Sequence, residues 1–541
     1  MPSSSPAVPA DGSLPSKAQA SAPRPQPSEP IVQPVIQPGV QPGVQPGVQP
    51  VIQPVGQASA SNSPPSLQAY QPPPRSAIAL ADFPASATWA APPPSPGCRA
   101  VDVAVVGASV VGLFIAQALA RRGYRCALIG PEAVASRQTE GFDARIYALS
   151  PASWAWIAQQ GLSGLIDGSR ITPITRMQLH AAAWSAARRG SQSSPPASSA
   201  LPMLEFDAAR EVREELAVTV EQSELMHAGR RALAFSGVTR LNASLAQLGA
   251  MEAGAGQRTI LLSDGTLLSA RLILGCDGAH SALRRLAGFR VRQHDYRARA
   301  VVANFACEYP HRNIASQWFT EEGVVALLPL PGYRVSLVWA APEDLAAALM
   351  RDSLQGLAAR VEQRCETLGG PCALGRLTCL GAPASFALTD LQVDSPVADR
   401  VALLADAAHV VHPMAGQGLN LGIGDLMVLN DQLARPGARQ DPGHPAVLAR
   451  YRRARREAVL SMSLLTRGLD QWMQLSSDRA LGRTLGWAWT GLARSALLKS
   501  FLIARAVGHG PYRSAHPLSA YPRSAHPHSA HPYSAHPSGG S

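Results

Sequence analysis

Paired cysteines, long apolar runs and lysine are scarce or absent in this chain of 541 residues. Its seven cysteines are odd in number and show no CxxC spacing, which predicts a reducing compartment and not a disulfide framework. No run of 18 or more apolar residues occurs, and the N-terminus has no basic segment followed by an apolar core. The sequence therefore predicts neither a membrane span nor a secretory signal. We expect a cytoplasmic protein, peripheral at most at the inner face of the membrane.

The basic charge is almost entirely arginine and is concentrated near the C-terminus. Only Lys17 and Lys499 are lysines among the 48 basic residues, and the formal net charge is +11. Residues 452–513 carry +8 of it, with tryptophans interleaved among Leu, Ile and Ala as in an amphipathic helix. This pattern favours an anionic membrane surface or a partner helix over nucleic acid. A solvated helical face explains it equally well.

Both ends of the chain have a composition that cannot build a core. Residues 1–97 are rich in Pro, Gln and Ser and include a tandem QPGV run, while residues 511–541 carry a recurring SAHP-type pentad. Such segments bury too little apolar surface to offset the entropy of ordering the chain. We expect both to be disordered, and we interpret the spaced histidines as a low-complexity expansion and not as a metal site.

The most informative stretch, RVALLADAAHVVHPMAGQGLNLGIGD, begins at Arg400. Its apolar run predicts a strand buried on both faces, with Asp406 at the tip, where a carboxylate can accept a hydrogen bond from a sugar hydroxyl. Pro413 delays the next helix until after Gly416, and the free N–H groups at the positive end of that helix favour an anion. The alternative is a glycine-rich turn with an incidental aspartate. His409 and His412 lack a third ligand, so we expect packing there and assign no metal.

The globular part opens with VDVAVVGASVVG and reads as strand, turn, helix and strand. The fingerprint G-x-G-x-x-G of dinucleotide-binding folds falls on Gly107, Ser109 and Gly112, so a serine replaces the middle glycine. A phosphate is expected at the N-terminus of the helix. The acidic residue that holds the ribose in such folds is replaced by Gly130. Glu132 is the substitute that we predict, with a surface glutamate as the alternative.

Two further polar positions are candidates for the same site. Residues 259–278 predict a hairpin that turns at Asp264-Gly265 and ends in Asp277-Gly278, a second carboxylate at a strand tip. Arg145 is a candidate for a pyrophosphate contact, with a surface salt bridge to Asp143 as the alternative.

Residues 300–339 change to short strands, which predicts an antiparallel sheet, and one helix is expected near residues 345–367. Apolar side chains of these strands either line a cavity or form ordinary core: Trp318, Phe319, Leu328, Val335, Leu337 and Trp339. Residues 451–507 have helical periodicity.

These blocks, over about residues 99–510, resemble the flavin-dependent aromatic hydroxylases of ubiquinone biosynthesis, within the para-hydroxybenzoate-hydroxylase-like monooxygenases. The resembling blocks, in chain order, are GASVVG, DARIYALS, VEQSEL, GCDGAHSALR, QWFTEEGVVALLPLPGYRVSLVW, DAAHVVHPMAGQGLNLGIGD and GLARSALLKSFLIARAVG. The resemblance implies one bound FAD, reduction by NADH or NADPH, and hydroxylation by O2 of a phenol that carries a polyprenyl tail. The flavin, as its C4a-hydroperoxide, is then the reagent, and no catalytic side chain is expected.

The resemblance also assigns roles to residues. Gly107 and Gly112 are expected to hold the pyrophosphate, Asp406 the ribityl chain, and the turn before the following helix the flavin ring, where the helix dipole stabilises negative charge. The complete predicted cofactor site is Gly107, Ser109, Gly112, Glu132, Arg145, Asp277, Gly278, Asp406, Pro413, Gly416, Gln417, Gly418 and Asn420.

Three residues depart from the family pattern at this site: Ser109, Gly130 and Ala405, which stands where the family usually has glycine. Two alternatives therefore stay open. One is a weakly active or non-catalytic partner in a quinone-synthesis assembly, and the other is a hydroxylase of a different aromatic compound.

The expected fold is α/β with α+β parts, in which a Rossmann-like FAD-binding domain is interleaved with an antiparallel-sheet substrate domain. The FAD-binding segments that we predict are residues 98–180, 221–298 and 391–450, and the substrate-domain segments are residues 181–220, with a Ser/Pro-rich loop, and 299–390. Basic helices follow at residues 451–510.

Overall fold

The computed structural model describes residues 99–131, 141–181, 203–250, 256–320, 322–367, 374–411 and 417–476. Contacts divide the chain after Asp82, and all described residues belong to the unit that runs from Phe83 to Ser541. The two predicted tails, the Ser/Pro-rich loop and the helical prediction beyond Ser476 lie outside the described residues.

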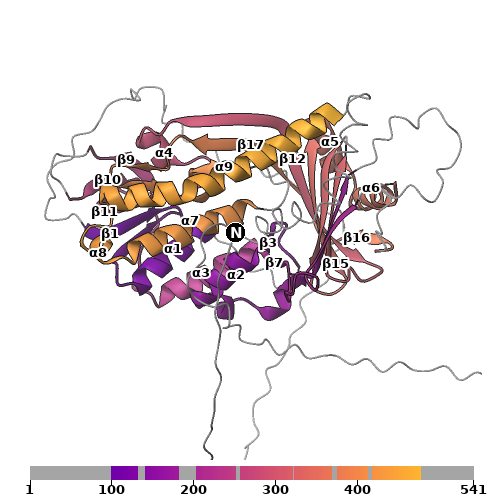
Figure 1. The fold of residues 1–541 in the computed structure, drawn as a ribbon, viewed down its shortest axis with the longest axis horizontal. Helices are drawn as coiled ribbons and strands as arrows, with labels where there is room; N and C mark the ends of the chain where they lie inside the picture. The colour runs from indigo at the N-terminus through magenta and orange to yellow at the C-terminus, as the bar shows by residue number, and fades with distance from the viewer. Residues whose placement is uncertain are drawn as a thin grey trace, which may run out of the picture. The chain divides into compact units, whose positions relative to one another are not determined.

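The first sheet contains the predicted strand–helix–strand unit (Figure 1). Within the described residues it has eight strands, which are β18 (Val397–Ala398), β19 (Val401–Leu403), β11 (Leu267–Gly275), β1 (Arg99–Val106), β2 (Cys126–Ile129) and β8 (Thr239–Leu241) in spatial order, with β10 (Arg258–Leu262) and β9 (Leu245–Leu248) attached through β11. The pairs from β19 to β8 are parallel, and β10 and β11 form the predicted antiparallel hairpin.

Both faces of this sheet are covered, which is why its central strands are almost entirely apolar. Val103 and Val105 of β1 pack against α1 (Val110–Arg121), α3 (Gln222–Ala234) and α7 (Gly418–Leu433). Ala104 and Val106 point to the other face, where they join a core with β9, β10 and α4 (Ala282–Leu286). This alternation follows from the two-residue period of a strand.

The second sheet has nine strands among the described residues, and its antiparallel character was predicted correctly. Its order is β20 (His409–Val410), β17 (Ala384–Val393), β12 (Val291–Cys307), β15 (Arg334–Pro342), β14 (Gly323–Leu330), β13 (Ile314–Thr320), β5 (Arg176–Ala181) and β6 (Met203–Asp207), with β16 (Leu377–Cys379) beside β12. Only the β13–β5 pair among the described pairs of this sheet is parallel. A small sheet of β3 (Ile146–Leu149), β7 (Ala217–Glu221) and β4 (Thr172–Ile174) packs against β14.

Of the two alternatives for the apolar side chains of the second sheet, ordinary core is the one observed, and the six side chains do not line one cavity. Trp318, Leu337 and Trp339 share a face with Val335 and form ordinary core with α5 (Glu343–Arg351) and α6 (Leu354–Thr367). Phe319 and Leu328 belong to separate clusters on the opposite face. The reason is the strand period, since neighbouring residues such as Trp318 and Phe319 must point to opposite faces.

The single helix predicted near residues 345–367 is two helices. Asp352 has an extended conformation, and Ser353 starts a new helix because its hydroxyl accepts the backbone N–H of Gly356 at 3.0 Å.

The last described helix, α9 (Pro445–Ser476), passes over α7 (Figure 1). It bonds to both large sheets: the Tyr451 hydroxyl donates to the carbonyl oxygen of Leu403 on β19, and Arg467 forms an ion pair with Asp390 on β17. Of the helices described here, none has the length and hydropathy needed to cross a bilayer. The remaining described elements are short: α2 (Pro151–Gln159), α8 (Pro436–Gln440) and 3-10 turns at Ser163–Leu165, Gly168–Arg170 and Ala405–Ala407.

Candidate cofactor site

Four parallel strands of the first sheet end at one edge. The register places Val106 of β1 opposite both Ile129 of β2 and Gly275 of β11, and Gly275 opposite Leu403 of β19. The residues that follow these strands therefore gather there: Gly107, Gly130, Cys276 and Leu404. Ligands of open α/β sheets bind outside the carboxyl ends of the strands, so this edge is the candidate site.

Gly107 and Gly112 are fixed by close approach of backbone at this edge. Gly107 has φ of 111°, and a Cβ added there would lie 2.3 Å from the carbonyl oxygen of Cys276. A Cβ on Gly112 would lie 1.9 Å from the carbonyl oxygen of Gly107. No side chain fits at either position, and the glycines let α1 start immediately after β1. Its first N–H groups, which lack partners within the helix, are then available to a phosphate.

Ser109, the departure at the middle glycine, caps α1. Its hydroxyl accepts the N–H of Gly112 at 3.2 Å and donates to the carbonyl oxygen of Cys276 at 3.0 Å. The hydroxyl is thus committed to holding β1, α1 and β11 together, and in this conformation the backbone provides the donors for a phosphate.

Gly130 leaves the end of β2 without a carboxylate. A Cβ there would lie 2.8 Å from the backbone nitrogen of Ala108, so a larger residue would require the turn after β1 to move. Glu132, the predicted substitute, lies outside the described residues.

The two carboxylate oxygens of Asp277 have different surroundings. Oδ2 accepts the N–H of Leu283 at 3.1 Å, at the start of α4. Oδ1 is buried and has no partner among the described residues. Gly278 follows with φ of 78°, which turns the chain towards α4.

The Asp406 carboxylate has no hydrogen bond or ion pair within the described part of the chain, although it lies in a charged environment. The side chain is exposed, but the protein atoms packed around it displace part of its water. This desolvation raises the pKa of Asp406, and the charges of His409 and Arg145 oppose the rise. The carboxylate is therefore well placed to accept hydrogen bonds from the hydroxyl groups of a ligand.

The turn that carries Asp406 is held from several sides. Ala405 has φ of 49°, a left-handed conformation that costs a residue with a Cβ about 1 kcal/mol or more. Its N–H donates to Asp425 of α7 at 2.8 Å. Arg284 of α4 donates to the carbonyl oxygen of Ala407 at 3.0 Å, so a third element fixes the other end.

Asp425 is the centre of a buried charged network. Its side chain is 1% exposed and lies 2.7 Å from Nε2 of His409 and 2.6 Å from Nε of Arg455. Burial alone would raise the pKa of Asp425, but the charges of His409 and Arg455 outweigh it and hold the pKa at about 2. Asp425 is therefore ionised at neutral pH.

Arg145 faces the second sheet and not Asp143. Its guanidinium lies 4.0 Å from the ring centroid of Phe386 on β17, and Nη1 donates to Gln222 at 3.4 Å. The Tyr147 hydroxyl also donates to Gln222, at 2.9 Å, and burial raises the pKa of Tyr147 to about 12, so the phenol keeps its proton. The predicted alternative of an Arg145–Asp143 salt bridge is thus not observed.

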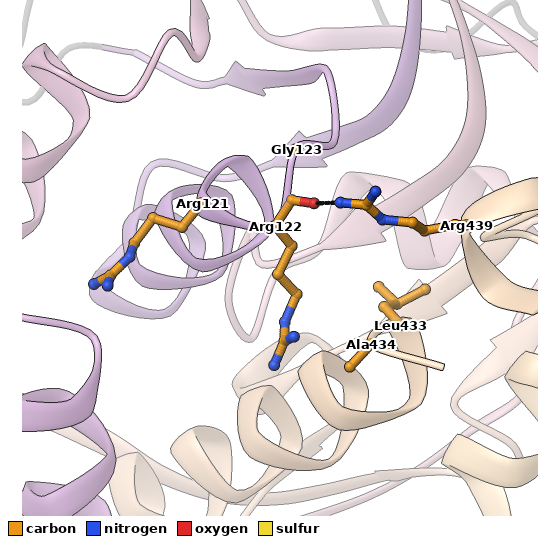
Figure 2. A pocket seen from close by; sticks show the side chains of 6 residues that line it. All are labelled: Arg121, Arg122, Gly123, Leu433, Ala434 and Arg439. Atoms are coloured by element: carbon orange, nitrogen blue, oxygen red, sulfur yellow. Dashed lines mark hydrogen bonds between the residues drawn. The ribbon is translucent and has the colours of Figure 1, made fainter. Parts of the chain in front are cut away.

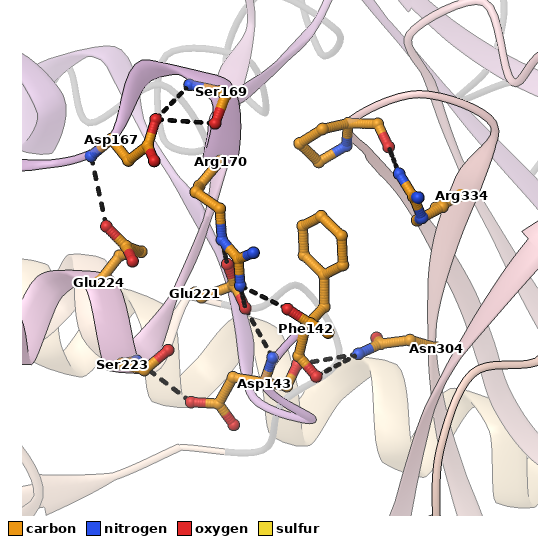
Figure 3. Close-up of polar contacts among 12 residues, drawn as sticks. Phe142, Asp143, Asp167, Ser169, Arg170, Glu221, Ser223, Glu224, Asn304 and Arg334 are labelled. Carbon is orange, nitrogen blue, oxygen red and sulfur yellow. Dashed lines mark hydrogen bonds and ion pairs between the residues drawn. The ribbon is translucent and has the colours of Figure 1, made fainter. Parts of the chain in front are cut away.

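A set of polar contacts clamps the segment before β3 (Figure 3). Asp143 accepts the backbone N–H of Ser223 and donates its own N–H to Glu221, which is paired with Arg170 at 2.6 Å. Asn304 of β12 donates to the carbonyl oxygen of Asp143 at 2.9 Å. These contacts fix Arg145 and the start of β3, which carries Tyr147, and they reach β12 of the second large sheet through Asn304.

The start of α7 is described in part. Pro413 and Gly416 lie outside the described residues, and Gln417 is the N-cap of the helix. A Cβ on Gly418 would meet no described atom within 4 Å, so the part of the chain that the structure describes leaves this end of the helix open. Asn420 donates to the carbonyl oxygen of Ala148 and accepts the N–H of Ser150, both at 2.9 Å. Its side chain therefore joins α7 to the end of β3.

Sequence reasoning missed Asp425, Arg455 and Arg284. The signal for Asp425 was available, because it lies four residues from both Leu421 and Leu429 and so falls on the buried face of a helix, where a charge needs a partner. The identity of that partner was not available from local sequence.

A hollow lies at the opposite end of α1 from the candidate site (Figure 2). It is lined by Arg121, Arg122, Gly123, Leu433, Ala434 and Arg439. Arg122 donates to Asn430 of α7, and Arg439 donates to the carbonyl oxygen of Arg122. Both guanidiniums therefore hold the C-terminal end of α1 in place. Within the described residues, no cluster of His, Cys, Asp and Glu is suited to a metal ion.

The residues at the sheet edge fit an FAD. The first turn of α1 suits a pyrophosphate, and the unpartnered oxygens of Asp277 and Asp406 suit hydroxyl groups. Fold and site together are those of an FAD-dependent aromatic hydroxylase. Residues 100–463 match the family described as FAD binding domain, and the chain belongs to this family.

The chain is similar to ubiquinone hydroxylase UbiL of Rhodospirillum rubrum, with 31% identity over 415 residues that cover 76% of this chain and 90% of the relative. It is also 31% identical to the 3-demethoxyubiquinol 3-hydroxylase of Escherichia coli, over 65% of this chain and 85% of the relative. Among solved structures, p-nitrophenol 4-monooxygenase PnpA of Pseudomonas putida shares the fold, with a TM-score of 0.57 and 17% identity over 76% of this chain and 98% of that one.

Proposed function

We propose that this protein hydroxylates the aromatic ring of a polyprenylated phenol in ubiquinone biosynthesis, using O2 and NADH or NADPH. The observation that carries the proposal is the Asp406 carboxylate, which has no bonding partner within the described residues and lies at the same sheet edge as the N-terminus of α1. The relatives named for ubiquinone hydroxylation support the choice of substrate.

Bound FAD would supply electron transfer from NAD(P)H and the activation of O2. The chain's own residues do the binding and positioning. Gly107 and Gly112 allow backbone N–H groups to hold the pyrophosphate, Asp406 accepts hydrogen bonds from the ribityl chain, and the open start of α7 stabilises negative charge. Arg145 and Phe386 connect the cofactor edge with the second sheet, to which we assign binding of the phenol.

We also propose the predicted division into FAD-binding segments (98–180, 221–298 and 391–450) and substrate-domain segments (181–220 and 299–390). The membership of the two large sheets supports it, since β1, β11 and β19 lie together in the first sheet and β13, β14 and β15 lie together in the second.

The outer face of α9 supports a cytoplasmic protein that is peripheral at an anionic membrane. Arg453, Arg456, Leu460 and Leu464 are exposed, with Leu460 and Leu464 at 46% and 62%, and their spacing places them along one side of the helix. An amphipathic surface of this kind suits an enzyme whose substrate carries a membrane-embedded tail. A quinone-synthesis partner at the same face is the alternative.

The test is a reaction with the wild-type protein saturated with FAD and supplied with NADPH, O2 and prenylated phenols. We expect NADPH oxidation that depends on the phenol and a product heavier by one oxygen. Binding of FAD without hydroxylated product would favour the partner function, and product only from unprenylated aromatics would favour a different substrate class.

A further inference from the structure

The turn that carries Asp406 is held by Asp425, a residue of the distant helix α7. Ala405 is one of the described non-glycine residues with positive φ, and the carboxylate of Asp425 accepts its N–H at 2.8 Å. The same carboxylate binds His409, three residues beyond Asp406. Asp425 therefore grips the chain on both sides of the proposed ligand to FAD.

Helix α9 also holds this turn, through Arg455 and Tyr451. Arg455 donates from Nε to Asp425 at 2.6 Å and from Nη2 to the carbonyl oxygen of Leu421 at 2.8 Å. Gly424 makes room for it, because a Cβ there would lie 2.9 Å from the guanidinium. Tyr451 holds the end of β19 through the carbonyl oxygen of Leu403. The turn is thus held by α7 and α9 together.

Gly422 leaves space in α7 for the side chain of Ala405. A Cβ on Gly422 would lie 2.7 Å from Cβ of Ala405 and 3.5 Å from Cγ2 of Val111 in α1. Ala405 can stand where the family pattern has glycine because Gly422 leaves the space empty.

We propose that Asp425, held by Arg455, is a positioning residue that imposes the left-handed turn at Ala405 and thereby aims the Asp406 carboxylate at the hydroxyl groups of FAD. This inference rests on the proposed FAD-dependent function. It makes α9 a structural part of the cofactor site, in addition to any role of its outer face.

Two pairs of substitutions test the inference. Asp425→Asn replaces one acceptor oxygen by a donor that faces His409 or Arg455, and we expect FAD to bind about tenfold more weakly or worse. Because glycine adopts the left-handed conformation without help, Ala405→Gly should restore most of the lost affinity in the Asp425→Asn background. A general loss of stability would not be restored in this way.

The second pair leaves the charged network intact. Gly422→Ala should weaken FAD binding by forcing two Cβ atoms together, and the double variant Gly422→Ala with Ala405→Gly should bind like the wild type because the clash is gone. This pair keeps the test decisive if Asp425→Asn fails to fold.

Asp390→Asn is the matched control. Asp390 is also buried and paired with an arginine of α9, Arg467, but its carboxylate lies on β17 and has no described hydrogen bond to Ala405–Ala407. We expect it to lower the melting temperature while the FAD dissociation constant stays within about twofold of the wild type.

The readouts are FAD titration of the apoprotein and hydrogen exchange of the Ala405 amide, which needs no flavin. We expect faster exchange at Ala405 in Asp425→Asn and wild-type FAD affinity in the Gly422→Ala/Ala405→Gly variant. Unchanged exchange and affinity in Asp425→Asn, or no rescue in either double variant, would overturn the inference. A wild-type protein that binds no FAD would instead overturn the proposed function, while the exchange data would still report on the turn.

Discussion

The hydroxyl of Ser109 donates a 3.0 Å hydrogen bond to the carbonyl oxygen of Cys276 and so joins the start of α1 to the end of β11. A middle glycine could not make this bond. The serine also accepts the N–H of Gly112, which makes it the N-cap of α1. The departure from the glycine fingerprint therefore has a structural role, and the backbone remains free to bind a phosphate.

Ser109→Ala should lower the unfolding free energy by about 1 kcal/mol, because it removes a helix cap. It should change FAD affinity less than tenfold, since the hydroxyl points to Cys276. Denaturant unfolding of the apoprotein and FAD titration measure the two effects separately. A large loss of FAD affinity with unchanged stability would show that the hydroxyl binds the cofactor directly.

Because of Asp425, we expect part of the free energy of unfolding to be lost at acidic pH. Its folded pKa of about 2 lies below the ordinary value, so its contribution is present above about pH 4 and is lost as the pH falls towards 2. A depression of this size corresponds to about 2 kcal/mol. Unfolding free energies of the wild type and Asp425→Asn should therefore converge as the pH falls from about 4 to about 2.

The outer face of α9 predicts binding to anionic vesicles. Each basic residue near such a surface contributes on the order of 1 kcal/mol, so Arg453→Glu with Arg456→Glu should reduce pelleting, and added salt should do the same to the wild type. Arg210→Glu with Arg351→Glu changes the charge equally at exposed positions elsewhere and serves as the control. Equal pelleting with neutral and anionic vesicles would contradict the electrostatic part of the proposal.

We expect the two Pro-rich tails to contribute nothing to the stability of the folded part. Deletion of residues 1–95 and 514–541 should leave the melting temperature nearly unchanged at equal flavin loading, because the first capped helix starts only at Val110. A large decrease in melting temperature would show that a tail packs on the folded part.

Local patterns predicted the first part of the fold closely. The strand predicted at Val101–Val106 is β1, Arg99–Val106, and the helix predicted at Val110–Arg122 is α1, Val110–Arg121. These elements have strong local signals, which are an apolar strand, a serine cap and a terminating glycine.

Relationships between distant segments were not predictable in the same way. No local pattern tells that Arg455 reaches Asp425, or that Gly422 faces Ala405, because these contacts depend on how α7 and α9 pack. Around Trp318 the sequence left a cavity lining and ordinary core open, and the strand period decides for core, because Trp318 and Phe319 must point to opposite faces of the sheet. The cofactor residues that fall outside the described part, Glu132, Pro413 and Gly416, remain predictions.

The most direct test of the account is FAD titration of apoprotein carrying Asp406→Ala, with Asp406→Asn beside it. Loss of a charged hydrogen-bond acceptor should cost about 1.5 to 3 kcal/mol, which weakens FAD binding roughly ten- to a hundredfold. Asparagine keeps one neutral acceptor and should fall between alanine and the wild type. If Asp406→Ala is folded and binds FAD as tightly as the wild type does, Asp406 does not hold the cofactor and the proposed site is wrong.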